Sequence, residues 1–371
     1  MRAGLLAIIG ATLGVGLGFG ADAAPRWTAS DLTALHDVAQ DAGAEGLSDY
    51  DAEPLLSLAP GDLTDPVADA IALRLARDYF EGSDHVRGDR SWHIERGSLD
   101  YEAWLGDALS HHSVRASFRS LLPQDARYTA LRRTLAGCAK PVECARIAIN
   151  LDRLRALPRD LGSRYLWVDV PAYRLDVVEN GRTVASHRII VGKPGSQTPS
   201  FQAKVTGVTI NPWWNVPCSI VDESVGKLVT SNPREAARRG YVATRDAKGK
   251  LTVRQKPGPD NALGRIKLEM PNPFDVYIHD TPSRDLFARS TRAFSHGCIR
   301  TEDPESLAVT LLGETAETTV NLLLATGVSR TLKLSEPIPV YVVYVTAEAA
   351  ADGTGQPQFY PDIYRRDGVR P

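Results

Sequence analysis

The hydrophobic positions in the first part of the chain follow the period of helices. Asp65-Pro66 forms a typical helix start, an N-cap residue followed by proline, and Gly82 is a typical helix end. Residues 101–122 and 145–157 show the same helical spacing. The pattern predicts a helical region over residues 25–158 whose apolar stripes pack into a core. Between Asp65 and Gly82 the stripe consists of Ala68, Ile71, Leu75 and Tyr79.

From about residue 165 the pattern changes to alternating polar and apolar positions with many β-branched side chains, which is typical of strands. The dipeptide Asn180-Gly181 predicts a two-residue hairpin turn. Asp303-Pro304 predicts the start of a helix that ends at Gly313, and Asp352-Gly353 predicts a closing turn. The predicted strands cover residues 165–170, 173–179, 183–191, 204–210, 275–279, 320–325 and 339–346.

Length and composition agree with more than one folded region. The 371 residues are enough for two domains, and a hydrophobic content of 43% can fill a core. The net charge of -2 gives no sign of nucleic-acid binding. Residues 219–258 have no clear period and carry many charges, so composition alone predicts a solvated loop there. Loops of that length within compact domains are often functional lids.

The N-terminus has the pattern of an export signal. Arg2 provides a short positive region, residues 3–20 are apolar, and residues 21–24 offer small side chains for cleavage. Glycines within the apolar run weaken the interpretation as a membrane-spanning helix, although an uncleaved anchor stays open as the alternative. In either case the remainder of the chain is predicted to lie outside the cytoplasm.

Export changes the interpretation of the four cysteines, because disulfides persist in oxidising compartments. Cys138 and Cys144, separated by five residues, are predicted to form a local disulfide. A metal pair is not predicted, because no second pair or histidine cluster accompanies them. Cys218 is predicted to be a packed, unreactive thiol, with a regulatory disulfide to Cys298 as the alternative.

One stretch carries the residues for nucleophilic chemistry, Ser295-His296-Gly297-Cys298-Ile299-Arg300. A further histidine, His279, ends a predicted strand, and fifteen residues, 280–294, separate it from Ser295. Thiolate chemistry needs a cysteine, a nearby base and backbone donors that face the developing oxyanion. Gly297 allows a tight turn beside the nucleophile. Arg300 and His296 add positive charge that favours the thiolate.

This spacing resembles the signature of the L,D-transpeptidase (YkuD-type) catalytic domain. The resemblance implies an α+β fold, in which a β-sandwich catalytic domain with a lid-like insertion follows a helical scaffold domain. It divides the chain into a signal peptide (1–24), a scaffold domain (25–160), a catalytic domain (161–350) with a capping insertion (219–258), and a C-terminal extension (351–371). Further matching segments are 170–175, 191–193, 211–217, 259–264 and 271–273.

The resemblance also implies a function, peptidoglycan L,D-transpeptidation in the periplasm. The donor would be a tetrapeptide stem, the acceptor a diaminopimelate amine, and no metal or cofactor is implied. Cys298 would be the nucleophile and His279 the proton acceptor and donor, with His296, Gly297 and Arg300 completing the catalytic group. Backbone N–H groups around Gly297 and Cys298 would hold the oxyanion. Residues expected to contact the substrate are Tyr277, Ser295, Trp213 and Asn215.

Several alternatives remain open at this point. The same Cys/His site would serve an L,D-carboxypeptidase or an amidase, or a transpeptidase that forms 1-3 cross-links. A non-catalytic wall-binding scaffold is a further alternative, against which the intact Cys298 and His279 and the lack of a wall-binding repeat argue. Asp280, Ser295 or a backbone carbonyl could orient His279. The sequence assigns no oligomeric state.

Overall fold

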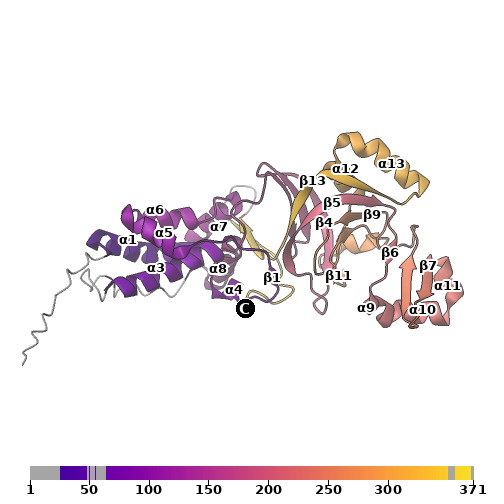
Figure 1. The fold of residues 1–371 in the computed structure, drawn as a ribbon, viewed down its shortest axis with the longest axis horizontal. Helices are drawn as coiled ribbons and strands as arrows, with labels where there is room; N and C mark the ends of the chain where they lie inside the picture. The colour runs from indigo at the N-terminus through magenta and orange to yellow at the C-terminus, as the bar shows by residue number, and fades with distance from the viewer. Residues whose placement is uncertain (1–25, 48–49, 51–54, 56–63, 350–355, 369–371) are drawn as a thin grey trace, which may run out of the picture.

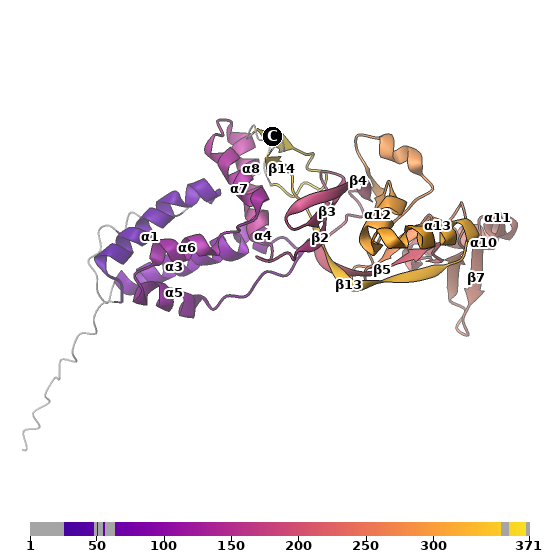
Figure 2. The same cartoon turned by 90° about the horizontal axis from the view of Figure 1, so that it is seen from above.

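A computed structural model describes residues 26–47, 50, 55, 64–349 and 356–368. The predicted signal peptide and the predicted turn at Asp352-Gly353 lie outside the described residues. Within the described part of the chain, no helix is both long and apolar enough to cross a membrane. The molecule is elongated, with a helical region at one end and a β-rich region at the other (Figures 1 and 2).

The N-terminal region is helical, as predicted. A capping box of Thr28 and Asp31 begins the first helix, and a core that includes Trp27, Leu75 and Phe118 holds the helices together. Its elements are α1 (Ala29–Asp41), η1 (Ala42–Glu45), α3 (Thr64–Glu81), α4 (Asp84–Arg87), β1 (Trp92–His93), α5 (Tyr101–Ser110), α6 (Val114–Leu121), α7 (Ala126–Ala136) and α8 (Pro141–Arg155).

Two details of the predicted helices are wrong. Asp65 lies inside the first turn of α3 rather than at its N-cap, and its carboxylate accepts the backbone N–H groups of Arg26 and Trp27 at 2.7 and 3.3 Å. The helix predicted over 101–122 is two helices, because the backbone leaves the helical conformation at His112, where φ is 47°. The predicted disulfide between Cys138 and Cys144 is confirmed and lies just before and within α8.

The β-rich region is built on one sheet that closes on itself. Its strand order is β1-β5-β13-β2-β3-β4-β12-β10-β9, and a further pairing of β9 with β5 completes a ring around a core that includes Leu166, Phe201 and Val342. The strands are β2 (Arg164–Asp169), β3 (Arg174–Glu179), β4 (Arg182–Gly192), β5 (Ser200–Ile210), β9 (Ile266–Glu269), β10 (Ile278–His279), β11 (Ala293–Ser295), β12 (Ile299–Thr301) and β13 (Arg330–Val343). A helical region followed by a mostly β domain confirms the predicted α+β class.

The turn predicted at Asn180-Gly181 and the cap predicted at Asp303 are confirmed, but one predicted strand is not. Asn180 and Gly181 have φ values of 49° and 75°, as a type I′ hairpin turn requires. The side chain of Asp303 caps α12 (Pro304–Leu312) by accepting the N–H of Ser306. The strand predicted at 320–325 is part of α13 (Glu317–Thr326). Its buried positions, Val320, Leu323 and Leu324, have helical spacing, which a short apolar run does not distinguish from a strand.

Residues 219–258 are folded, so the loop predicted from composition is wrong. Together with residues just before and after them, they form a separate unit with a core that includes Trp214, Val221, Val225, Val253 and Leu263, at the end of the molecule opposite the helical region (Figure 1). Strand β6 joins this unit in a three-stranded sheet of order β6-β8-β7. The elements are β6 (Trp214–Asn215), α9 (Cys218–Ile220), η2 (Val221–Val225), α10 (Gly226–Ser231), α11 (Pro233–Arg238), β7 (Tyr241–Arg245) and β8 (Leu251–Gln255).

The helical and β-rich regions pack directly against each other. Ile147 and Leu151 of α8 share a core with Trp167 of β2 and Val343 of β13. Strand β1 pairs with the edge of β5, and β14 (Ala347–Ala349) pairs with β15 (Pro357–Phe359). The chain after β15 returns between α8 and the sheet, so three distant parts of the sequence meet there (Figure 2).

Candidate active site

The parallel pairing of β10 with β12 brings the two motif segments together. Ile278 lies opposite Ile299, and His279 opposite Arg300. Since side chains alternate across a strand, Ile278 and Ile299 point into the core, where both are fully buried. Their neighbours Tyr277, His279, Cys298 and Arg300 therefore share the other face, and all four line one pocket.

The orientation of His279 is set by a backbone carbonyl. Its Nδ1 lies within hydrogen-bond distance of the carbonyl oxygen of Asp280, and a carbonyl can only accept, so Nδ1 carries the proton and Nε2 is the basic nitrogen. The carboxylate of Asp280 is engaged elsewhere, with the N–H groups of Arg265 and Thr281 at 2.7 and 2.6 Å and with Arg284 at 2.8 Å. Of the three groups considered from the sequence, the geometry selects the carbonyl.

Burial favours the neutral forms of both His279 and Cys298. Burial, followed by the charge of Arg300, lowers the pKa of His279 to about 3, while the carbonyls of Asp280 and Leu263 oppose this change. Burial also raises the pKa of the Cys298 thiol above its ordinary value, although Tyr277 and Arg300 favour the thiolate. The thiol donates a weak hydrogen bond to the carbonyl of Asp275 at 3.7 Å.

The loop before Cys298 is held by the side chain of Ser295, which is buried. Its hydroxyl donates to the carbonyl of Cys298 at 2.6 Å and accepts the N–H of Gly297 at 3.1 Å. Gly297 has a φ of +118°, which favours glycine. The N–H of Gly297 is therefore occupied, whereas the N–H of Cys298 donates to no group among the described residues. Of the two oxyanion donors predicted, only the N–H of Cys298 is free.

Arg300 and Tyr277 set the electrostatics beside the thiol. Arg300 is partly buried, and its Nε has no partner among the described residues. Burial lowers the pKa of Arg300, and the neighbouring thiol opposes this. Burial and the charge of Cys298 raise the pKa of Tyr277 to about 12, so its hydroxyl keeps its proton at neutral pH. The aromatic ring of Tyr277 also lies 6.0 Å from that of His279.

The pocket has a volume of about 510 Å³ and is walled partly by the folded insertion. Trp214, between the two predicted contact residues, lines it, but Trp213 and Asn215 do not. Alternation along β6 places Asn215 on the face opposite Trp214, and Trp213, just before the strand, stacks with Arg254 at 4.6 Å. Other lining residues absent from the sequence prediction are Pro217, Ser219, Ile220, Ser224, Val225, Tyr241, Ala262, Leu263, Phe274 and Asp275.

Comparison with known proteins identifies the family of the chain. The L,D-transpeptidase catalytic domain model, YkuD, matches residues 163–331, and a scaffold domain model matches residues 21–135. A Haemophilus influenzae protein described as a candidate L,D-transpeptidase is 30% identical over 387 residues, which cover 93% of this chain and 76% of that protein. The chain belongs to the L,D-transpeptidase family. L,D-Transpeptidases are cell-wall enzymes that act on peptidoglycan stem peptides.

Solved L,D-transpeptidases show more distant similarity. An enzyme from Mycobacterium smegmatis is 14% identical with a TM-score of 0.25, over 49% of this chain and 58% of that one. The catalytic domain of an Enterococcus faecium L,D-transpeptidase acylated by ertapenem is 14% identical with a TM-score of 0.23, over 50% of this chain and 99% of that one. This L,D-transpeptidase thus spans little more than half the length of the M. smegmatis structure.

His296 connects the loop before Cys298 to the insertion. Its Nε2 lies 3.1 Å from the carboxylate of Glu223 in η2 and 3.3 Å from Nζ of Lys193. The packed thiol predicted for Cys218 is wrong, because Cys218 is exposed at the start of α9. Cys218 and Cys298 are both free thiols, so the alternative disulfide between them is not formed.

Proposed function

We propose that this L,D-transpeptidase cross-links peptidoglycan stem peptides through a thioester on Cys298, with His279 as the proton acceptor and donor. The observation that carries this proposal is the shared strand face that places both side chains in one pocket. The neighbouring Tyr277 and Arg300 add a hydroxyl and a positive charge to the same face. The predicted export signal and the disulfide between Cys138 and Cys144 support a periplasmic location.

In the first half-reaction, Nε2 of His279 accepts the thiol proton as the sulfur attacks a carbonyl carbon of the donor tetrapeptide. This carbonyl belongs to the diaminopimelate residue and is bonded to the nitrogen of the terminal D-Ala. Because the resting pair is neutral, proton transfer accompanies the attack rather than preceding it. The N–H of Cys298 donates to the oxyanion, and Arg300 adds positive charge. The C–N bond then breaks, and D-Ala leaves with the proton that His279 returns.

In the second half-reaction, the amine of an acceptor diaminopimelate attacks the thioester carbonyl. His279 accepts the amine proton and returns it to the departing thiolate, which regenerates Cys298. The insertion walls the pocket with Ile220, Val225 and Tyr241, and this apolar cover disfavours attack by water. The balance between amine and water decides between cross-linking and hydrolysis.

The test is to incubate the purified protein with disaccharide-tetrapeptides and to identify the products by mass spectrometry. We expect a cross-linked dimer that has lost D-Ala, and no product from Cys298→Ala with its fold intact by circular dichroism. Cys298→Ser should be nearly inactive, because a hydroxyl ionises far less readily than a thiol. Tripeptide alone would identify a carboxypeptidase, and a linkage through the first stem residue would identify 1-3 cross-linking. Product from Cys298→Ala would exclude the thioester.

The same thiol should be acylated by a carbapenem, because a β-lactam carbonyl requires the same attack. Intact-protein mass spectrometry should show one adduct that Cys298→Ala loses. Peptide mapping distinguishes Cys298 from the exposed Cys218. An adduct on Cys218 would contradict the assignment of the nucleophile.

A further inference from the structure

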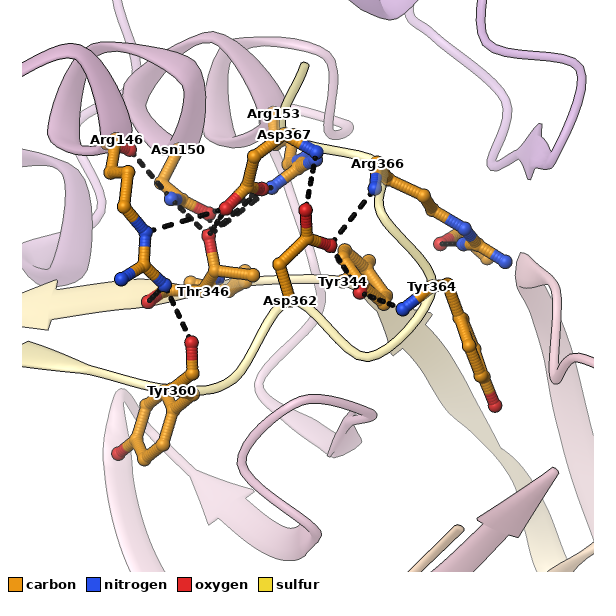
Figure 3. A network of polar contacts seen from close by, with 12 residues as sticks. Arg146, Asn150, Arg153, Tyr344, Thr346, Tyr360, Asp362, Tyr364, Arg366 and Asp367 are labelled. Carbon is orange, nitrogen blue, oxygen red and sulfur yellow. Dashed lines mark hydrogen bonds and ion pairs between the residues drawn. The ribbon is translucent and has the colours of Figure 1, made fainter. Parts of the chain in front are cut away.

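The segment 356–368, which follows β14 by sequence, is anchored to the last scaffold helix. Asp367 is buried, and its carboxylate accepts hydrogen bonds from Arg153 of α8 at 2.7 Å and from Thr346 at 2.9 Å (Figure 3). Asn150 of α8 donates to the hydroxyl of Thr346 and accepts its N–H, both at 2.8 Å. The Asp367 carboxylate also lies 3.4 Å from Nε of Arg146, so two arginines of α8 neutralise its charge, although the buried Nη2 of Arg153 has no partner among the described residues. The segment is therefore fixed at one end.

Tyr364 carries this anchor toward the catalytic domain. Its ring stacks on that of Tyr344 at 5.5 Å, and its N–H donates to the Tyr344 hydroxyl at 2.8 Å. The hydroxyl of Tyr364 points away from the anchored cluster (Figure 3). It donates to the carbonyl of Gly192 at 2.6 Å and accepts the N–H of Thr198 at 3.2 Å. One hydroxyl thus braces both ends of the loop between β4 and β5.

Thr198 continues the brace to the catalytic loop. It is completely buried, and its hydroxyl donates to the carbonyl of Gly297 at 2.8 Å while accepting the N–H of Gly192 at 3.0 Å. A Cβ at Gly192 would overlap Ser196, so the loop packs too closely there for any side chain. The hydrogen bonds from Tyr364 through Thr198 end on the peptide that joins Gly297 to Cys298.

The direction of that peptide decides where the oxyanion donor points. A trans peptide is planar, so its C=O and N–H point in opposite directions. With the Gly297 carbonyl held by Thr198, the N–H of Cys298 points the other way, and it donates to no group among the described residues.

We propose that Tyr364 and Thr198 are positioning residues that aim the N–H of Cys298 at the oxyanion. The segment 356–368 is then a working part of the active site rather than an appendage. This inference rests on the proposed function, in which Cys298 attacks a carbonyl. The hydroxyls of both residues are well placed for such a role because each is shielded from water and makes two hydrogen bonds.

The experiment compares two reactions of Cys298 that differ in their need for an oxyanion donor. Carbapenem acylation passes through an oxyanion, whereas alkylation by iodoacetamide displaces iodide and forms none. The full-length protein is reacted and then digested, and both rates are measured by mass spectrometry from the modified fraction of the peptide that contains Cys298. Tyr364→Phe should lower the acylation rate roughly tenfold and Thr198→Val roughly 10- to 100-fold, with alkylation within about twofold of the parent. Thr198→Ser keeps the hydroxyl and should restore acylation.

Tyr360→Phe is the matched control, because Tyr360 belongs to the same segment but its hydroxyl donates to Glu348 and accepts from Arg174, away from the catalytic loop. It should acylate like the parent. If Tyr364→Phe is acylated as fast as this control, the inference is overturned. It is also overturned if acylation and alkylation of Tyr364→Phe fall in parallel, because that result indicates general damage to the site. Tyr364→Phe keeps the stacked ring, so it decides the matter if Thr198→Val does not fold. Failure of the parent to acylate would instead refute the proposed function itself.

Discussion

Gly264 lies against the side-chain carboxylate of Asp280, the residue that follows His279. Its φ is +61°, and a Cβ at this position would overlap Cγ and Oδ2 of Asp280. That carboxylate is buried and accepts the N–H groups of Arg265 and Thr281, while the carbonyl of the same residue orients His279. The substitution Gly264→Ala must therefore displace Asp280 and disturb the orientation of His279.

Two costs combine in this variant. An alanine in the left-handed region costs about 1–2 kcal/mol. Displacing the Asp280 carboxylate removes two hydrogen bonds to a charged acceptor, at about 1.5–3 kcal/mol each. Together these predict that Gly264→Ala lowers the free energy of unfolding by about 4–8 kcal/mol. Gly181→Ala is the control, because Gly181 has a φ of +75° with nothing within 4 Å of the added Cβ, so it has only the backbone cost.

The two variants are compared with the parent by urea denaturation at pH 7. Gly264→Ala should lose at least about 3 kcal/mol more than Gly181→Ala, and its carbapenem acylation should slow because His279 loses its fixed orientation. Equal losses of stability in the two variants would refute the reasoning, since the backbone cost alone would then account for both. Unchanged acylation in Gly264→Ala would show that the Asp280 carbonyl is not needed to orient the base.

Three further predictions concern pH, the disulfide and the insertion. Burial lowers the pKa of His279 to about 3. Between about pH 6.5 and pH 3 the unfolded chain therefore binds a proton that the folded protein does not. The stability that neutral His279 contributes is complete above about pH 6.5 and declines toward pH 3 by about 1.4 kcal/mol per pH unit. The urea midpoint should fall over that range more steeply for the parent than for His279→Gln, and identical slopes would contradict this. Replacing Cys138 and Cys144 together with serine should lower the free energy of unfolding by about 2 kcal/mol with acylation unchanged, and an unchanged thermal midpoint would contradict the stabilising role. Replacing residues 219–258 with a Gly-Ser linker should shift the products from dimers to tripeptides while acylation persists, whereas loss of acylation would show that the insertion belongs to the catalytic fold.

The features that the sequence predicted depend on neighbouring residues. The hairpin at Asn180-Gly181 and the cap at Asp303 need only a few adjacent side chains, and both are confirmed. The shared pocket of His279 and Cys298 was predictable because each residue adjoins a strand of the motif. Alternation along these two strands also accounts for the positions of Tyr277 and Arg300.

The features that the sequence missed depend on contacts between distant parts of the chain. The pairing of β9 with β5 closes the sheet, and no local pattern encodes it. The small core around Val253 in the insertion is also not apparent from the sequence, because charged residues dominate the composition of that segment. Trp214 rather than Trp213 lines the pocket, and a strand of only two residues does not reveal from the sequence which face meets the pocket. The hydroxyl of Tyr364 meets Gly192 across 172 positions of sequence, which no motif would connect.

The burial that keeps Cys298 protonated also affects its chemical durability. Oxidation by peroxide begins at the thiolate, so a thiol whose pKa is raised converts slowly to sulfenic acid. Any surroundings that preserve the bridge between Cys138 and Cys144 are oxidising enough to threaten an ionised cysteine. In the proposed mechanism, the thiolate of Cys298 forms only while a substrate carbonyl is attacked, so we expect the thiol to resist oxidative inactivation between turnovers.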